Sequence, residues 1–138
     1  MRWKISSRGA GNVRLLLDTA ILIYAVEAPE RLSKRAAAAL ENPENVLELS
    51  AISITDIAIK ASLGKLMLTA AIARQAVQDL DIRILPYTGD HALRLFDLPL
   101  HHGDPFDRQI IAQALCEKTP VVTPDDKFRL YNGLKIIW

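Results

Sequence analysis

Hydrophobic positions along the chain fall into short apolar runs that alternate with longer amphipathic segments. Short apolar runs bounded by acids, Pro or Gly are typical of buried strands, whereas apolar positions spaced three and four apart are typical of helices. The pattern therefore predicts five strands. They span residues 13–18, 46–52, 82–87, 120–123 and 133–138.

The segments between these strands carry helical patterns. We expect helices over residues 19–29, 30–42, 53–64, 69–80, 89–98 and 104–118, and one or two helical turns over residues 125–131. Strands that alternate with helices indicate right-handed crossovers and a mostly parallel sheet. The sequence thus predicts one α/β domain over residues 13–138, with a central sheet of about five strands flanked by helices. Residues 1–12 are expected to form a loose basic arm.

Composition narrows the function classes. Half of the 138 residues are hydrophobic, which is enough for the core of one domain. The formal net charge of +1 does not favour a broad basic face for nucleic acid, but it suits a nuclease in which a metal ion meets the phosphate. The single cysteine, Cys116, excludes an internal disulfide and a cysteine zinc site, and its helical neighbours predict a buried position. A reducing, cytoplasmic compartment fits, and no segment resembles a membrane span or a secretory signal.

Four aspartates occupy the same kind of place in the predicted fold. Asp18 ends the first strand, Asp56 lies early in the helix after the second strand, and Asp125 follows the fourth strand. Ligands of parallel sheets bind beyond the carboxyl ends of the strands, so these three acids should share one edge. Asp107 joins them if the helix over residues 104–118 begins at that edge.

Each acid also has a simpler explanation as part of a helix N-terminus, where acids and small polar caps are favoured. The cap and acid pairs in that interpretation are Ser53 with Asp56, Asp104 with Asp107, and Thr123 with Asp125. Caps need no common location, however, whereas these acids should converge. Converging carboxylates repel each other unless a cation neutralises them, and oxygen ligands suit Mg²⁺ or Mn²⁺. His101 and His102 are expected to be loop residues before the acidic helix, with a substrate contact as the alternative.

Four segments, "LLLDTAILIYA", "SAISITDIAIKASLGKL", "LPLHHGDPFDRQIIAQAL" and "PVVTPDDKFRLY", together resemble the PIN-domain ribonucleases, and in particular the VapC-type toxins of bacterial toxin–antitoxin pairs. The resemblance runs from about residue 14 to the C-terminus, with the motifs in the family's order. It implies a parallel α/β sandwich, a carboxylate cluster that binds Mg²⁺ or Mn²⁺, and endonucleolytic cleavage of RNA. It also implies a homodimer and a VapB-like antitoxin as partner.

The resemblance carries over residue by residue. The residues that match the four family acids are Asp18, Asp56, Asp107 and Asp125, and those that match hydroxyls near the metal waters are Thr19 and Thr123. Asp104 is an extra acid of the "DPFDR" branch, and we interpret it as a helix cap first and an outer metal contact second. The sequence departs from the pattern at Asp56, where glutamate is usual, and at Gly103, where a basic residue is common.

The leading hypothesis is a metal-dependent endoribonuclease toxin in which Asp18, Asp107 and Asp125 hold the metal and Asp56 orients water or helps hold the ion. The candidate contacts to the RNA backbone are Lys60, Lys65, Arg108 and Lys127. Two alternatives stay open. One is a PIN-fold binding protein whose site has decayed, and the other is a Mg²⁺-binding receiver-type phosphotransfer domain. The receiver class needs a lysine after a late strand, where this chain has Pro124 and acids.

Overall fold

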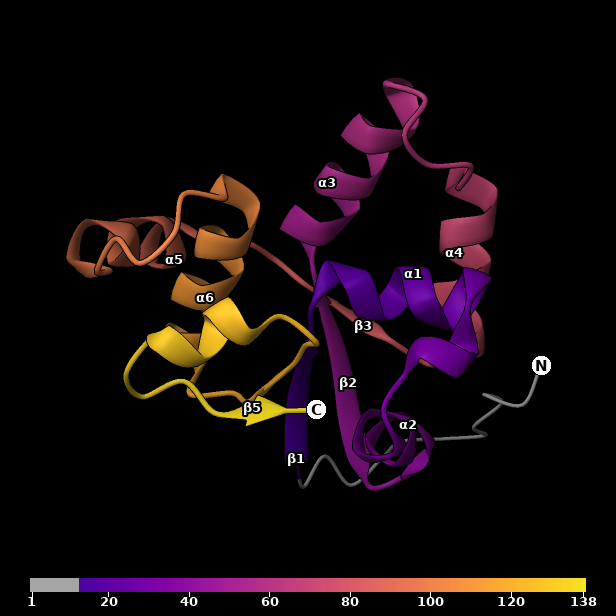
Figure 1. Cartoon of the computed structure of the whole chain (residues 1–138), viewed down its shortest axis with the longest axis horizontal. Helices are drawn as coiled ribbons and strands as arrows, with labels where there is room; N and C mark the ends of the chain where they lie inside the picture. The colour runs from indigo at the N-terminus through magenta and orange to yellow at the C-terminus, as the bar shows by residue number, and fades with distance from the viewer. Residues whose placement is uncertain (1–12) are drawn as a thin grey trace.

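Five parallel strands form one sheet in the order β3-β2-β1-β4-β5 in the computed structural model, which describes residues 13–138 (Figure 1). The expected N-terminal arm lies outside the described residues. The strands are β1 (Val13–Leu17), β2 (Asn45–Ser50), β3 (Arg83–Leu85), β4 (Val121–Val122) and β5 (Ile136–Ile137). All five predicted strands are therefore confirmed, and each is shorter than its apolar run.

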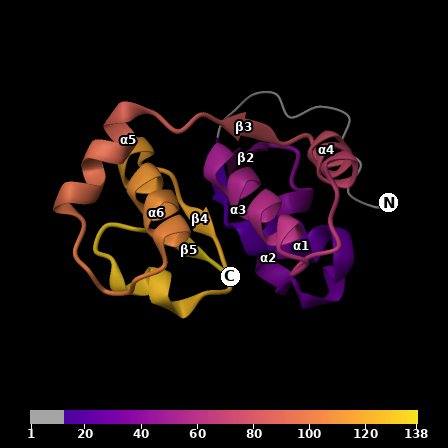
Figure 2. The same ribbon diagram turned by 90° about the horizontal axis from the view of Figure 1, so that it is seen from above.

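Helices cover both faces of this sheet (Figure 2). The α-helices are α1 (Thr19–Glu27), α2 (Lys34–Glu41), α3 (Ala51–Ser62), α4 (Ala70–Asp79), α5 (Gly89–Leu93) and α6 (Pro105–Glu117), and the 3-10 helices are η1 (Pro29–Arg31), η2 (Arg94–Asp97) and η3 (Asp126–Leu130). The helix predicted over residues 30–42 is interrupted, because Pro29 begins η1 and Ser33 then caps α2. Within residues 13–138, none of the helices combines the length and apolarity that a bilayer span requires.

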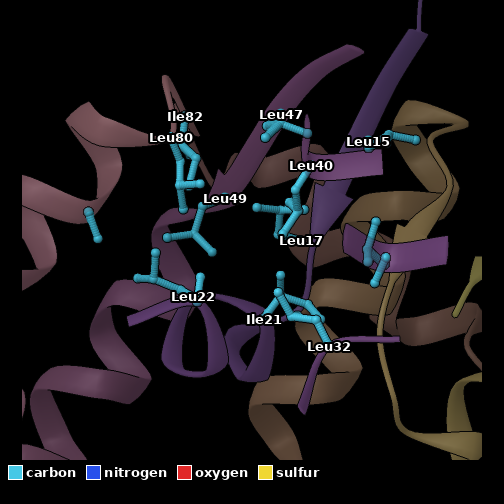
Figure 3. Packing of buried hydrophobic residues seen from close by; sticks show 14 of the residues in the cluster. Leu15, Leu17, Ile21, Leu22, Leu32, Leu40, Leu47, Leu49, Leu80 and Ile82 are labelled. Atoms are coloured by element: carbon cyan, nitrogen blue, oxygen red, sulfur yellow. The ribbon is translucent and has the colours of Figure 1, made fainter. Parts of the chain in front are cut away.

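The leucines of β1 divide the core into two clusters. Leu15 and Leu17 point into the cluster formed with α1, α2 and α4, part of which is drawn in Figure 3. Leu16 points the other way, into the cluster formed with α6 and η3. A strand that is buried on both faces has no polar side, which explains the continuous run of three leucines, residues 15–17, at the carboxyl end of β1.

The central strand β1 also marks the place where the strand order changes direction. β2 and β3 lie on one side of it, and β4 and β5 lie on the other. Two backbone hydrogen bonds join β4 to the carboxyl-terminal half of β1, from Leu16 N to Pro120 O (2.9 Å) and from Asp18 N to Val122 O (3.0 Å). Such a reversal is where open parallel sheets place their ligands, and Asp18 stands directly at it.

Cys116 is exposed, so the prediction that it is buried is wrong. The fully buried positions of α6 are consecutive, from residue 110 to residue 114, and the helix emerges from the core after them. The Cys116 thiol instead lies 3.8 Å from the carbonyl oxygen of Asp90 in α5.

A charged network that the sequence analysis did not identify lies beside the sheet. The carboxylate of Glu48 in β2 is fully buried, and it pairs with the Nη2 atoms of Arg14 (2.9 Å) and Arg83 (2.7 Å). Arg14 also pairs with Glu117 of α6 (2.9 Å), which accepts a 2.7 Å hydrogen bond from the buried His91. The hydrogen bonds from His91 and Arg14 hold the pKa of Glu117 below its usual value. The network thus connects β1, β2 and β3 to α5 and α6.

We expect Glu48→Gln to destabilise the fold by about 1–3 kcal/mol, because it removes the charge that pairs with two arginines. The loss is smaller than for a fully buried ion pair, because the side chains of Arg14 and Arg83 are 34% and 63% exposed. Urea unfolding measures the effect, with the exposed Glu44→Gln as the matched control. Equal stability of the two variants would contradict a stabilising role for the ion pairs of Glu48.

Candidate functional site

The carboxylate of Asp18 is held rigidly at the end of the central strand. Asp18 follows β1 and caps α1, and its side chain is buried, with 5% of the residue exposed. One carboxylate oxygen, Oδ1, accepts from the backbone N–H of Thr19 (2.8 Å), and the other, Oδ2, accepts from the hydroxyl of Thr123 (2.7 Å). Thr123 thus contacts the first acid through its hydroxyl and Thr19 contacts it through its backbone, whereas the role of the two hydroxyls near metal waters stays a prediction.

Helix α3 begins earlier than the sequence pattern predicted. Its N-cap is Ser50, whose hydroxyl accepts from the N–H of Ile52 (3.0 Å), so the prediction of Ser53 as the cap is wrong. Ala51 and Ile52 continue the apolar run of β2 in the sequence, which conceals the start of the helix. Ser53 is instead a fully buried residue whose hydroxyl accepts from the hydroxyl of Thr19 (2.9 Å). Asp56 lies in the second turn of α3, where a capping role does not apply.

Asp56 is buried, with 4% of the residue exposed, and it pairs with the lysine one turn further along α3. The ammonium of Lys60 lies 3.2 Å from Oδ1 and 3.4 Å from Oδ2, and only the contact with Oδ2 has hydrogen-bond geometry. Oδ1 is buried and accepts no hydrogen bond from any atom of residues 13–138. Asp56 therefore has one buried oxygen that lies beside the Lys60 ammonium but accepts no hydrogen bond.

The N-terminus of α6 confirms one capping prediction. The Oδ1 atom of Asp104 accepts from the backbone N–H groups of Phe106 (2.9 Å) and Asp107 (3.1 Å), and Pro105 is the first helical residue. Asp104 is exposed, whereas the side chain of Asp107 is 19% exposed. The two aspartates thus differ in their contacts: Asp104 caps the N-terminus of α6, whereas the carboxylate of Asp107 takes no part in the cap.

Asp125 reaches the site from the turn after β4. It caps η3 itself by accepting from the N–H of Lys127 (2.9 Å), so the prediction of Thr123 as the cap is wrong. The hydroxyl of Thr123 accepts from the N–H of Asp125 (3.1 Å) while it donates to Asp18. Thr123 therefore links the first and the fourth predicted acids.

The negative charges of the four predicted acids act on one another. Burial raises the pKa of Asp18 to about 6, and the negative charges of Asp125 and Asp56 add to this, against the hydrogen bonds that the carboxylate accepts. Burial also raises the pKa of Asp107 to about 7, with further contributions from the charges of Asp18, Asp104, Asp125 and Asp56. Asp104 thus belongs to the electrostatic environment of the cluster even though its hydrogen bonds are those of a cap.

The chemistry of this cluster fits a hard divalent cation. All four acids provide carboxylate oxygens, which are the ligands that such cations prefer. Their negative charges add to the effect of burial in raising the pKa values of Asp18 and Asp107. One buried oxygen of Asp56 also accepts no hydrogen bond from residues 13–138. Among residues 13–138, however, no three His, Cys, Asp or Glu side chains are arranged to ligate one ion together. Rotation of side chains or bridging water would have to complete the coordination, and Mg²⁺ commonly keeps several waters.

His102, expected only as a loop residue with a substrate contact as the alternative, is a neighbour of Asp107. Its side chain is 8% exposed, its Nδ1 atom lies 2.7 Å from the Tyr131 hydroxyl, and its Nε2 atom lies 3.5 Å from Oδ2 of Asp107. Tyr131 is 2% exposed and was not identified at all. The signal that could have found His102 is its position just before the acidic helix. Nothing in the local pattern indicates Tyr131.

The four basic residues considered for RNA binding have different surroundings. Lys60 pairs with Asp56, and the guanidinium of Arg108 donates to the carbonyl oxygens of Leu98 (3.2 Å) and Pro99 (2.8 Å) and to the hydroxyl of Tyr131 (3.2 Å). The other two residues are exposed; they are Lys65 and Lys127.

Comparison with known proteins agrees with the fold. The family model described as "PIN domain" matches residues 15–134, a range that contains all four acids. A search of the curated proteins found no match.

Several solved structures share the architecture. A chain in the crystal structure of VapBC2 from Rickettsia felis bound to a promoter DNA fragment superposes with a TM-score of 0.66 at 18% identity, covering 90% of this chain and 97% of that one. A chain of DNA-bound VapBC from Salmonella typhimurium gives a TM-score of 0.60 at 16% identity, covering 90% and 96%. A chain of VapBC-5 from Mycobacterium tuberculosis gives 0.59 at 20% identity, covering 91% and 98%. At these identities the likeness is one of fold.

Replacing Asp18 by asparagine should stabilise the metal-free protein at high pH. A carboxyl group with a raised pKa stabilises the folded state fully below its unfolded pKa of about 4, and this contribution is lost as the pH rises through the folded pKa, about 6 for Asp18. The carboxamide carries no charge, so Asp18→Asn should exceed the wild type by on the order of 2–3 kcal/mol at pH 8 and converge with it near pH 4.

Urea unfolding in EDTA between pH 4 and pH 8 measures this difference. The matched control is Asp126→Asn, because the Asp126 side chain is 98% exposed. A difference between Asp18→Asn and the wild type that does not change with pH would contradict the electrostatic interpretation.

Asp104→Ala should lower stability by about 1 kcal/mol through loss of the cap of α6. Asp104→Asn should be nearly neutral, because asparagine also accepts from backbone N–H groups at an N-cap. Thermal unfolding of the two variants compares them directly. If Asn were as destabilising as Ala, the charge of Asp104, and not its capping bonds, would be the stabilising feature.

Proposed function

The chain belongs to the PIN-domain family, and from that premise we propose that it is a Mg²⁺- or Mn²⁺-dependent endoribonuclease that acts as the toxin of a toxin–antitoxin pair. The observation that carries this proposal is the shared electrostatic site of Asp18, Asp56, Asp107 and Asp125 at the carboxyl edge of a parallel sheet. Buried acids with raised pKa values are unfavourable for the fold alone and are characteristic of functional sites.

In this proposal Asp18, Asp107 and Asp125 hold the metal, with Thr19, Asp104 and Thr123 around them. When bound, Mg²⁺ or Mn²⁺ polarises the phosphate and lowers the pKa of a coordinated water. The hydrogen bonds from Thr123 and from the Thr19 backbone fix the Asp18 carboxylate in place. Asp56, whose buried Oδ1 atom lies 3.2 Å from the Lys60 ammonium, would orient the water for in-line attack on the phosphodiester or help to hold the ion once a metal ion displaced that ammonium.

The choice of RNA as substrate rests on the resemblance to VapC-type toxins. The exposed Lys65 and Lys127 are the candidate contacts to the phosphate backbone, because their side chains are open to solvent. Lys60 would join them if a metal ion took over the neutralisation of Asp56. Arg108 acts in this picture mainly through the loop that its guanidinium binds. The single cysteine is consistent with a reducing, cytoplasmic setting.

Apolar surface on α3 and α4 supports the proposal that the protein binds protein partners. A groove of about 780 Å³ lies between α1, α3 and α4, and its lining includes Leu22, Ile57, Leu66 and Val77. We propose that this groove receives an apolar segment of a VapB-like antitoxin. The neighbouring outer face of α3 exposes further apolar side chains, including Leu63, of which 64% is exposed, and we propose it as the homodimer contact.

One alternative has a specific observation in its favour. A PIN-fold protein without catalytic activity would agree with the lack of three side chains arranged around one ion in residues 13–138, and with aspartate in place of glutamate at position 56. The receiver-type alternative has less support, since β4 is followed by Thr123, Pro124 and Asp125 with no lysine among them. Measured Mn²⁺ binding and RNA cleavage separate these cases.

We expect Asp107→Asn to reduce metal-dependent RNA cleavage by about 10²–10³-fold, because it removes a carboxylate that would hold the metal ion, and that ion stabilises the negative charge of the reacting groups. Asp104→Asn should stay within about threefold of the wild type, since its caps are retained. The assay is cleavage of a fluorogenic single-stranded RNA in Mn²⁺, with a DNA oligonucleotide of the same sequence as the substrate control. An inactive wild type that also fails to bind Mn²⁺ in calorimetry would support the binding-protein alternative. Loss of activity in Asp104→Asn alone would reverse the roles of the two aspartates.

A further inference from the structure

The imidazole of His102 lies between Tyr131 and Asp107, and its hydrogen bond is to Tyr131. Only 8% of its side chain is exposed, its Nδ1 atom is 2.7 Å from the Tyr131 hydroxyl, and its ring contacts the Tyr131 ring edge-on at a centroid distance of 5.6 Å. Tyr131 itself is 2% exposed and lies at the end of η3. The ring orientation of His102 is therefore fixed by packing as well as by a hydrogen bond.

The hydrogen bonds of Tyr131 favour one of the two neutral tautomers of His102. Arg108 can only donate, and its Nη1 atom lies 3.2 Å from the Tyr131 oxygen, so that oxygen accepts. The hydroxyl hydrogen of Tyr131 is then available for Nδ1 of His102, and in this arrangement Nδ1 is the acceptor. A neutral imidazole that accepts at Nδ1 carries its proton on Nε2.

The Nε2 atom of His102 is buried and has no hydrogen-bond partner among residues 13–138. The carboxylate oxygen Oδ2 of Asp107 lies 3.5 Å from it, slightly beyond a hydrogen bond. A buried donor without an acceptor is unfavourable, and a carboxylate that accepts one fixed donor is restricted in its rotation. A small rotation of the Asp107 side chain would satisfy the donor.

We propose that His102 is a positioning residue for Asp107, in which Nε2–H donates to Oδ2 and leaves Oδ1 to face the other acids of the cluster. Arg108 and Tyr131 hold His102 in the tautomer that this contact needs. Partners that orient a ligating side chain in this way commonly change metal affinity or activity when they are removed. The effect on metal affinity rests on the proposed function, whereas the tautomer of His102 does not.

The tautomer can be measured on the metal-free protein at pH 8 by long-range ¹H–¹⁵N correlation NMR of the imidazole rings, with the His102 signals identified by their loss in His102→Gln. We expect the Nε2–H tautomer in the wild type. Tyr131→Phe removes the hydroxyl that donates to Nδ1, so it should yield a mixture of tautomers. A wild type in the Nδ1–H tautomer would overturn the proposal.

Two substitutions of His102 separate its two hydrogen bonds. His102→Gln places an amide donor close to the position of Nε2, toward Asp107, and loses the acceptor for Tyr131. His102→Asn places an acceptor close to the position of Nδ1, toward Tyr131, and loses the donor to Asp107. We expect the affinity for Mn²⁺, measured by calorimetry, to fall about 10–100-fold in His102→Asn and to stay within about threefold of the wild type in His102→Gln.

A double-mutant cycle provides the matched control. In the Asp107→Asn background, His102→Asn should cause no further loss of Mn²⁺ affinity, because the carboxylate that it positions is gone. Equal losses in His102→Asn and His102→Gln would indicate a packing role and overturn the proposal, as would an unchanged affinity in His102→Asn. If the wild type bound no Mn²⁺, both this proposal and the proposed function would be wrong. Normal binding by the wild type with a silent His102→Asn would contradict this proposal alone.

Discussion

The buried carboxylate of Asp18, at the carboxyl end of the central strand, is the constraint on which the site depends. Its two oxygens are bound by the backbone of Thr19 and by the hydroxyl of Thr123, so the same side chain joins the ends of β1 and β4. The strand order reverses between these two strands, and the crossovers leave to opposite faces. The acids of α3, of α6 and of the turn after β4 are thereby brought to one edge of the sheet, beside the Asp18 carboxylate, whose orientation is fixed by its hydrogen bonds.

Repulsion among the carboxylates of these acids destabilises the metal-free fold, and we connect this cost to the proposed function. Burial is the main cause of the raised pKa values of Asp18, about 6, and Asp107, about 7, and this repulsion adds to it. The two apolar clusters on either side of the sheet stabilise the fold against this repulsion. Lys60 offsets part of the negative charge through Asp56. A divalent cation would offset more of it, which is why we interpret the cluster as a metal site even though its side chains are not arranged around one ion within residues 13–138.

Features that depend on neighbouring residues were predictable from the sequence, and features that depend on distant partners were not. The five strands follow from apolar runs, and the Asp104 cap follows from Pro105 beside it. Ser50 and Ser53 are both good caps locally, and the choice between them depends on where β2 ends and on the Thr19 hydroxyl, 34 residues away from Ser53. The contacts of Glu48 with Arg14 and Arg83, and of His102 with Tyr131, likewise join separate elements and leave no periodic signal in the sequence.

The central claim, that a cation relieves the repulsion of this cluster, is tested most directly by the protons released when Mn²⁺ binds. Calorimetric titration in buffers of different ionisation enthalpy gives that number at about pH 6.5 and at about pH 8.5. The account predicts clear proton release at the lower pH, where Asp18 and Asp107 are partly protonated in the metal-free protein, and little release at the higher pH. Binding of Mn²⁺ with no proton release at either pH would contradict it, because the ion would then bind away from these carboxylates.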